Sequence, residues 1–80
     1  MRELVDIRKE IDSVDADIVA LYEKRMKLAE QVAEYKIGTG KKVLDKEREK
    51  SKLEKIAGLA STDFTRCGVT ELFEQIMAMS

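Results

Sequence analysis

Residues 3–37 read ELVDIRKEIDSVDADIVALYEKRMKLAEQVAEYKI, and this stretch decides the fold. Its apolar residues recur every three or four positions, which is the pattern of a helix with one apolar face. The stretch contains neither Gly nor Pro, and the following Gly38-Thr39-Gly40 can end a helix. We therefore predict one long helix over about residues 3–37. The residues on its apolar face are Leu4, Ile7, Ile11, Val14, Ile18, Leu21, Leu28, Val32 and Tyr35.

Arg25 falls on this face, at a position where the spacing predicts an apolar side chain. Burying a guanidinium costs on the order of several kcal/mol unless an anion meets it. Lys36 follows eleven residues later and returns to within about 20° of the same face, roughly 16 Å along the axis. Two cations therefore face the same way, and we expect something negative beside Arg25.

The composition suits a single all-α domain. The chain has 80 residues, of which 44% are hydrophobic and 39% charged, and it lacks Pro and His. A net charge of -1 excludes the broad basic field that drives nucleic-acid binding. Neither a signal peptide nor a membrane span is expected, and the lone Cys67 fits a reducing cytoplasm. Without His, neither a metal site nor a Ser/His or Cys/His nucleophile pair is expected.

The length of the first helix predicts a partner chain. Thirty-five helical residues span roughly 50 Å, whereas a compact chain of this size is about 30 Å across. One end must therefore project, and its apolar stripe would face water in a monomer. We predict a homodimer in which the long helices of two copies pack together.

Two shorter helices are expected after the long one. The first runs over about residues 45–60, with Asp45 as its N-cap, and the sequence STD breaks it at residues 61–63. The second runs over about residues 65–80 and looks truncated at Ser80. The predicted architecture is thus three helices in an intertwined homodimer.

The second helix carries charges that point inward. Glu49 precedes Leu53 by four residues and Ile56 by seven, so it shares their packing face. Asp45 stands one turn earlier, where it either caps the helix or meets a ligand. Arg48 either pairs with Asp45 or faces the same cavity.

Arg8 and Ser80 complete the candidates. Arg8 lies seventeen residues before Arg25, some 25 Å down the helix, so it cannot serve that site in its own chain. It is either an ordinary solvated charge or, in an antiparallel dimer, a neighbour of the partner's Arg25. Ser80 follows Phe73 and Ile76 at helical spacing, which turns its hydroxyl toward the core.

Four segments together resemble the all-α class of chorismate mutases, and they cover nearly the whole chain. They are IRKEID at 7–12, LYEKRMKLAEQVAEYK at 21–36, VLDKEREK at 43–50 and LFEQIMAMS at 72–80. The resemblance implies an intertwined homodimer that rearranges chorismate to prephenate in aromatic amino acid biosynthesis, without a cofactor. It is strongest in the combined spacing of Arg8, Arg25, Lys36, Asp45, Arg48 and Glu49.

The resemblance also implies roles for these residues. Arg25 and the partner's Arg8 hold the two substrate carboxylates, for which a planar guanidinium is well suited. Lys36 donates to the ether oxygen and stabilises the charge that develops there. Glu49 and the backbone near Asp45 bind the substrate hydroxyl. In addition, Arg48 lies beside the substrate carboxylates and contacts them directly or through a neighbour, and Ser80 contacts the ring carboxylate.

One departure from the family concerns the end of the chain. The family usually places a Gln or Glu one turn after the serine, as a second donor to the ether oxygen. This sequence stops at Ser80 and lacks that donor. Gln75 is not a substitute, because it lies five residues before Ser80 and points in another direction. Either the chain is a fragment, such as the N-terminal domain of a fusion with prephenate dehydratase or dehydrogenase, or its activity is weak.

A rival hypothesis is a non-catalytic helical dimerisation or effector-binding module. In that case Arg25 would be a buried polar residue that sets the helix register. Lys36 discriminates between the enzyme and the dimerisation module. Setting the helix register needs only one buried polar group, whereas binding a dianion needs several converging cations, of which Lys36 would be one.

Overall fold

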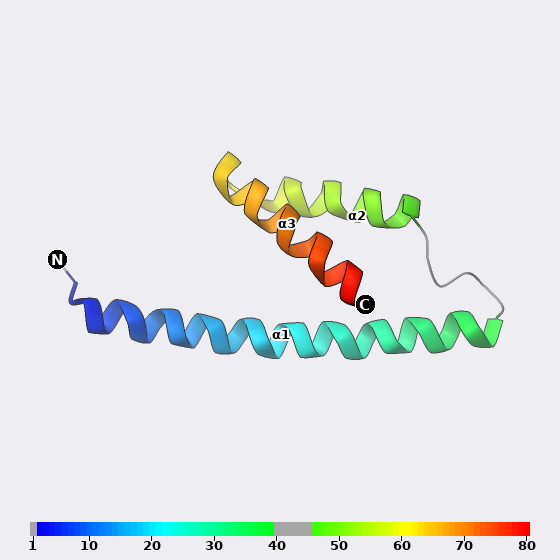
Figure 1. Ribbon diagram of the computed structural model, residues 1–80, viewed down its shortest axis with the longest axis horizontal. Helices are drawn as coiled ribbons and strands as arrows, with labels where there is room; N and C mark the ends of the chain where they lie inside the picture. The colour runs from blue at the N-terminus through cyan, green and yellow to red at the C-terminus, as the bar shows by residue number, and fades with distance from the viewer. Residues whose placement is uncertain (1, 40–45) are drawn as a thin grey trace.

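The structure is a computed structural model that describes residues 2–39 and 46–80. Within these ranges it consists of three helices, α1 (Leu4–Thr39), α2 (Lys46–Leu59) and α3 (Asp63–Met79), as Figure 1 shows. The prediction of an all-α fold is confirmed. None of these helices combines the length and the apolar character needed to cross a lipid bilayer.

The long helix α1 sets the shape of the molecule, which measures 57 × 25 × 15 Å. Helices α2 and α3 form a hairpin along one side of α1, and the N-terminal part of α1 extends beyond it (Figure 1). Residues 2–21 are all exposed. A helix of 36 residues cannot be covered by two shorter helices that pack mainly on each other.

The α2–α3 hairpin contains the small core of the chain. Ile56 and Ile76 are the buried hydrophobic residues of the described ranges, at 7% and 9% exposure. The Arg66 side chain and the Ala60 backbone N–H both donate to the carbonyl oxygen of Ala57, each at 3.2 Å. These bonds satisfy a carbonyl at the end of α2 and fix the start of α3 against it.

Helix α3 begins at Asp63, two residues before the start that the sequence predicts. The reason is Thr62, which has extended backbone angles and whose Oγ1 accepts a hydrogen bond from the Thr65 N–H at 3.1 Å. This is the geometry of an N-cap, so residues 61–63 both break α2 and start α3. The expected cap of α2, Asp45, lies outside the described residues.

Replacing this cap should have a measurable cost. We expect Thr62→Ala to destabilise the fold by about 1 kcal/mol, because the Thr65 N–H loses its acceptor. For a domain of this size the melting temperature should fall by about 4–8 °C, measured by circular dichroism. Ser61→Ala, one residue earlier, is the matched control, and an equal shift in both variants would contradict the cap.

The apolar face of α1 remains open in the single chain. Its nine residues, from Leu4 to Tyr35, are between 38% and 65% exposed. In its C-terminal half, α1 contacts α3 through Arg25, which is on the apolar face, and through Tyr22 and Met26 on the flank beside it. The chain thus covers α1 around Arg25 and leaves the nine apolar residues of this face exposed.

Candidate functional site

Arg25 meets the last two turns of α3. Arg25 is a half-buried residue, and its Nη1 donates a hydrogen bond to Ser80 Oγ at 3.2 Å. Its Cζ lies 5.9 Å from the centroid of the Phe73 ring, within the range of a cation–π contact. Phe73 and Ser80 are seven residues apart, two turns of one side of α3, and Arg25 bridges them.

The charge of Arg25 is not neutralised within the described ranges. Ser80 offers a neutral hydroxyl, and the ion pairs of these ranges, Arg2–Glu10 and Arg66–Asp63, lie elsewhere. No described carboxylate bonds to Arg25. The anion that the sequence predicts beside Arg25 is therefore not supplied by the described part of the chain.

Sulfur atoms and hydroxyl groups join α3 to α1 around Arg25. Ser80 Oγ donates to the carbonyl of Ile76 at 2.6 Å and lies 3.7 Å from Met26 Sδ. The Tyr22 hydroxyl lies 3.7 Å from Met79 Sδ. Sequence reasoning missed Tyr22, Met26 and Met79 as neighbours of the site. For Tyr22 and Met26, the position in the sequence could have indicated this, since Tyr22 is one turn before Arg25 and Met26 directly follows it.

Lys36 and Glu49 are the other half-buried charged candidates. Lys36 is on the same side of α1 as Arg25, about 16 Å further along. Glu49 lies in the first turn of α2, whose N-terminal end is above the C-terminal part of α1 in Figure 1. The fold thus brings the elements that carry Lys36 and Glu49 to the same end of the molecule.

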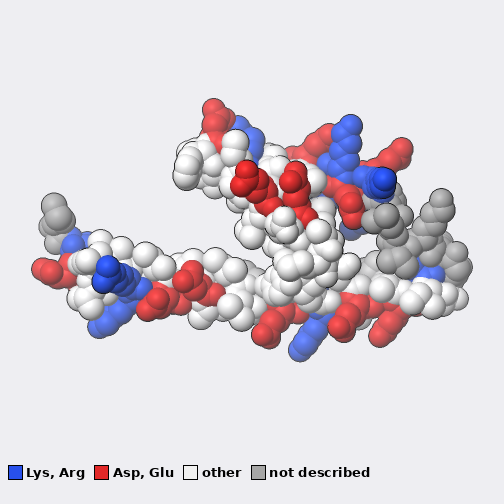
Figure 2. Space-filling model, viewed as in Figure 1, with Lys and Arg blue, Asp and Glu red and all other residues white. Residues whose placement is uncertain are grey.

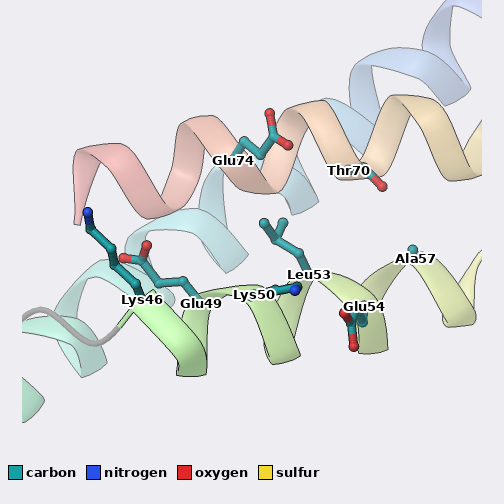
Figure 3. Close-up of a pocket in the computed structure, with 8 residues that line it drawn as sticks. All are labelled: Lys46, Glu49, Lys50, Leu53, Glu54, Ala57, Thr70 and Glu74. Atoms are coloured by element: carbon teal, nitrogen blue, oxygen red, sulfur yellow. The ribbon is translucent and has the colours of Figure 1, made fainter.

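Glu49 lines an open groove of about 450 Å³ between α2 and α3. Figure 3 shows its carboxylate and the side chain of Leu53 extending from α2 toward α3. Glu49 has no ion-pair partner among the described residues. The groove is lined by Lys46, Glu49, Lys50, Leu53, Glu54, Ala57, Thr70 and Glu74.

Arg8 and Arg48 lie outside the surroundings of Arg25 and the groove of Glu49 in the single chain. Arg8 is exposed on the projecting part of α1, about 25 Å from Arg25. Arg48 is exposed, and it lines a shallow depression on α2 together with Ser51, Lys52 and Lys55. Asp45 lies outside the described residues.

Charges of both signs are spread over the molecule, and Figure 2 shows no continuous basic surface in its view. Anion binding therefore depends on local groups such as Arg25. In the described ranges, the Ser80 hydroxyl contacts Arg25, the Ile76 carbonyl and Met26 Sδ, and none of these is a side-chain base that would activate it as a nucleophile. The arrangement is suited to holding and polarising an anion, rather than to covalent chemistry.

Comparison with known proteins points to one family. The family model described as chorismate mutase type II matches residues 7–80. A bifunctional chorismate mutase/prephenate dehydratase of Buchnera aphidicola is 38% identical over 79 residues, which is 98% of this chain and 20% of that protein. A protein of the same description from Aquifex aeolicus is 41% identical over 59 residues, 74% of this chain and 16% of that protein. No solved structure gave a significant match.

The chain spans a fifth or less of the length of these two relatives. The family match, by contrast, covers all three helices except the first turn of α1. It includes every residue that the sequence singles out, from Arg8 to Ser80. The chain therefore belongs to the chorismate mutase type II family.

Proposed function

We propose that this domain catalyses the rearrangement of chorismate to prephenate in aromatic amino acid biosynthesis. The observation that carries the proposal is Arg25, a half-buried guanidinium without a carboxylate partner among the described residues. A substrate carboxylate supplies the missing charge, and a guanidinium can bind it through two parallel hydrogen bonds. The family match gives this anion its identity.

The proposed mechanism needs no covalent step. Arg25 and Ser80 hold a carboxylate, which fixes the substrate in the conformation that brings the two ends of its rearranging system together. Lys36 donates a hydrogen bond to the ether oxygen, where negative charge develops as the carbon–oxygen bond breaks. Glu49 accepts a hydrogen bond from the substrate hydroxyl, and Arg48 supports the carboxylates. Asp45 contributes to the hydroxyl site through its backbone.

The proposal includes a homodimer whose sites are shared between chains. Two observations support it, namely the exposed apolar face of α1 and a core in which two residues are buried. Two antiparallel α1 helices that cross near Ala16 bring Arg8 of one chain beside Arg25 of the other, because the crossing is midway between these positions. The partner's Arg8 then binds the second carboxylate.

We also propose that the domain works in the cytoplasm as one part of a longer enzyme. The exposed, unpaired Cys67 suits a reducing compartment. The names of the two relatives describe bifunctional proteins, in which a mutase is joined to a prephenate dehydratase. A prephenate-consuming domain on the same chain would use the product of this one.

The direct test is the loss of chorismate absorbance with the purified 80-residue chain. We expect conversion to prephenate that saturates with chorismate concentration and exceeds the uncatalysed rate. A second arm uses the chain extended by four residues that end in Gln, which restores the donor that the family usually places one turn after the serine. We expect this arm to be faster, and no rate above background in either arm would contradict the proposal.

A further inference from the structure

The ring of Phe73 lies beside the Arg25 guanidinium and neither neutralises its charge nor accepts one of its hydrogen bonds. The ring centroid lies 5.9 Å from Arg25 Cζ, and both side chains are half-buried. A guanidinium has five N–H donors, and one of them is used by Ser80. The ring offers its negative face to the cation and leaves the other N–H donors available for a ligand.

This contact differs from the usual way of fixing a half-buried arginine. A neighbouring carboxylate would hold the guanidinium more strongly, but it would also neutralise it and occupy the two donors that a substrate carboxylate needs. An aromatic face stabilises the cation and leaves both available. The position of the cation is therefore set before the anion arrives, which reduces the entropic cost of binding.

We infer that Phe73 is a positioning residue that orients Arg25 for the substrate carboxylate. The inference rests on the proposed function, because the ligand of Arg25 is taken to be chorismate. The substrate carboxylate is bound in the ground state and in the transition state alike. Loss of the ring therefore weakens both equally, which raises KM and leaves kcat unchanged.

The test is the kinetics of Phe73→Leu, which keeps an apolar side chain and removes the aromatic face. We expect KM for chorismate to rise on the order of threefold to thirtyfold, the range that corresponds to exposed and desolvated cation–π contacts. We expect kcat to stay within about twofold. Phe73→Tyr keeps the aromatic ring, so its KM should equal that of the unmodified chain.

Phe64 provides a matched control on the same helix. It is 90% exposed, and the structure gives it no contact with Arg25. Phe64→Leu makes the same chemical change away from the site, so we expect an unchanged KM. An equal rise of KM in the two Leu variants would overturn the inference.

A readout that does not depend on turnover separates this inference from the proposed function. In an NMR spectrum of arginine-labelled protein, the Arg25 side-chain protons should be shifted upfield by the ring, and Arg25→Lys identifies the signal. Phe73→Leu should abolish the shift, while Phe73→Tyr should retain it. An Arg25 signal without this shift in the unmodified chain would overturn the inference, even if the chain converts chorismate.

The possible failures are therefore distinguishable. If the unmodified chain shows the shift but does not convert chorismate, the proposed function and the kinetic role of Phe73 fail while the contact stands. If Phe73→Leu does not fold, the KM and the Arg25 signal of Phe73→Tyr are compared with those of the unmodified chain. This variant must then keep both KM and the upfield shift, and a tenfold rise of its KM would overturn the inference.

Discussion

Replacing Lys36 by Ala is expected to lower kcat on the order of a hundredfold to a thousandfold, the usual cost of removing one donor to a developing negative charge. Lys36 is a half-buried residue on the side of α1 that carries Arg25. In the proposed reaction it stabilises the ether oxygen as the bond to it breaks, an interaction that is stronger in the transition state than in the ground state. The loss should therefore appear in kcat rather than in KM alone.

Lys27→Ala is the matched control for Lys36→Ala. Lys27 is an exposed residue of the same helix, nine positions earlier and thus on the opposite side. Its replacement should leave kcat unchanged, and both variants should melt within a few degrees of the unmodified chain. If Lys36→Ala unfolds the protein, the hypothesis of a non-catalytic dimerisation module gains support instead. Full activity of Lys36→Ala would contradict the role proposed for Lys36.

Arg8→Ala is expected to have the second large effect, although Arg8 is exposed and about 25 Å from Arg25 in its own chain. In the proposed dimer it binds a substrate carboxylate from across the interface. Removing one member of such a charge pair costs kcat/KM on the order of a hundredfold to a thousandfold. The measurement is the steady-state kinetics of the variant, together with its mass by analytical ultracentrifugation.

Lys9→Ala is the control for Arg8→Ala, because it removes a positive charge at a neighbouring position that points elsewhere. Lys9 is the neighbour of Arg8 in the sequence and is also exposed, but it points about 100° away around the helix. We expect Lys9→Ala to keep its activity, and we expect both variants to remain dimers. A monomeric Arg8→Ala, or a fully active one, would contradict the role of Arg8 in a shared site.

The helices could be predicted because their signals are local. A three-and-four spacing from Leu4 to Tyr35, followed by glycine, defines a long helix in any surroundings. The start of α3 was placed two residues late, because a threonine between two helices was interpreted as a breaker of the first. In the structure Thr62 is also the cap of the next helix.

The surroundings of Arg25 could be predicted only in part. A cation on an apolar face indicated a site, and the spacing of Ser80 indicated an inward hydroxyl, which the structure places 3.2 Å from the guanidinium. The contacts of Phe73 and Met26 depend on how α3 crosses α1, and this crossing is a tertiary property that no local pattern encodes. For the same reason, periodicity identified the apolar face of α1 but not what covers it.

Mixing two inactive variants shows whether each site is assembled from two chains. Arg8→Ala and Arg25→Ala dimers should each have both sites damaged. After unfolding and refolding together, half of the dimers should be mixed, each with one intact site and one site that lacks both arginines. We expect about a quarter of the activity of the unmodified chain to return. Activity that stays at the level of the separate variants, in a mixture shown by mass spectrometry to contain mixed dimers, would contradict a site shared between chains.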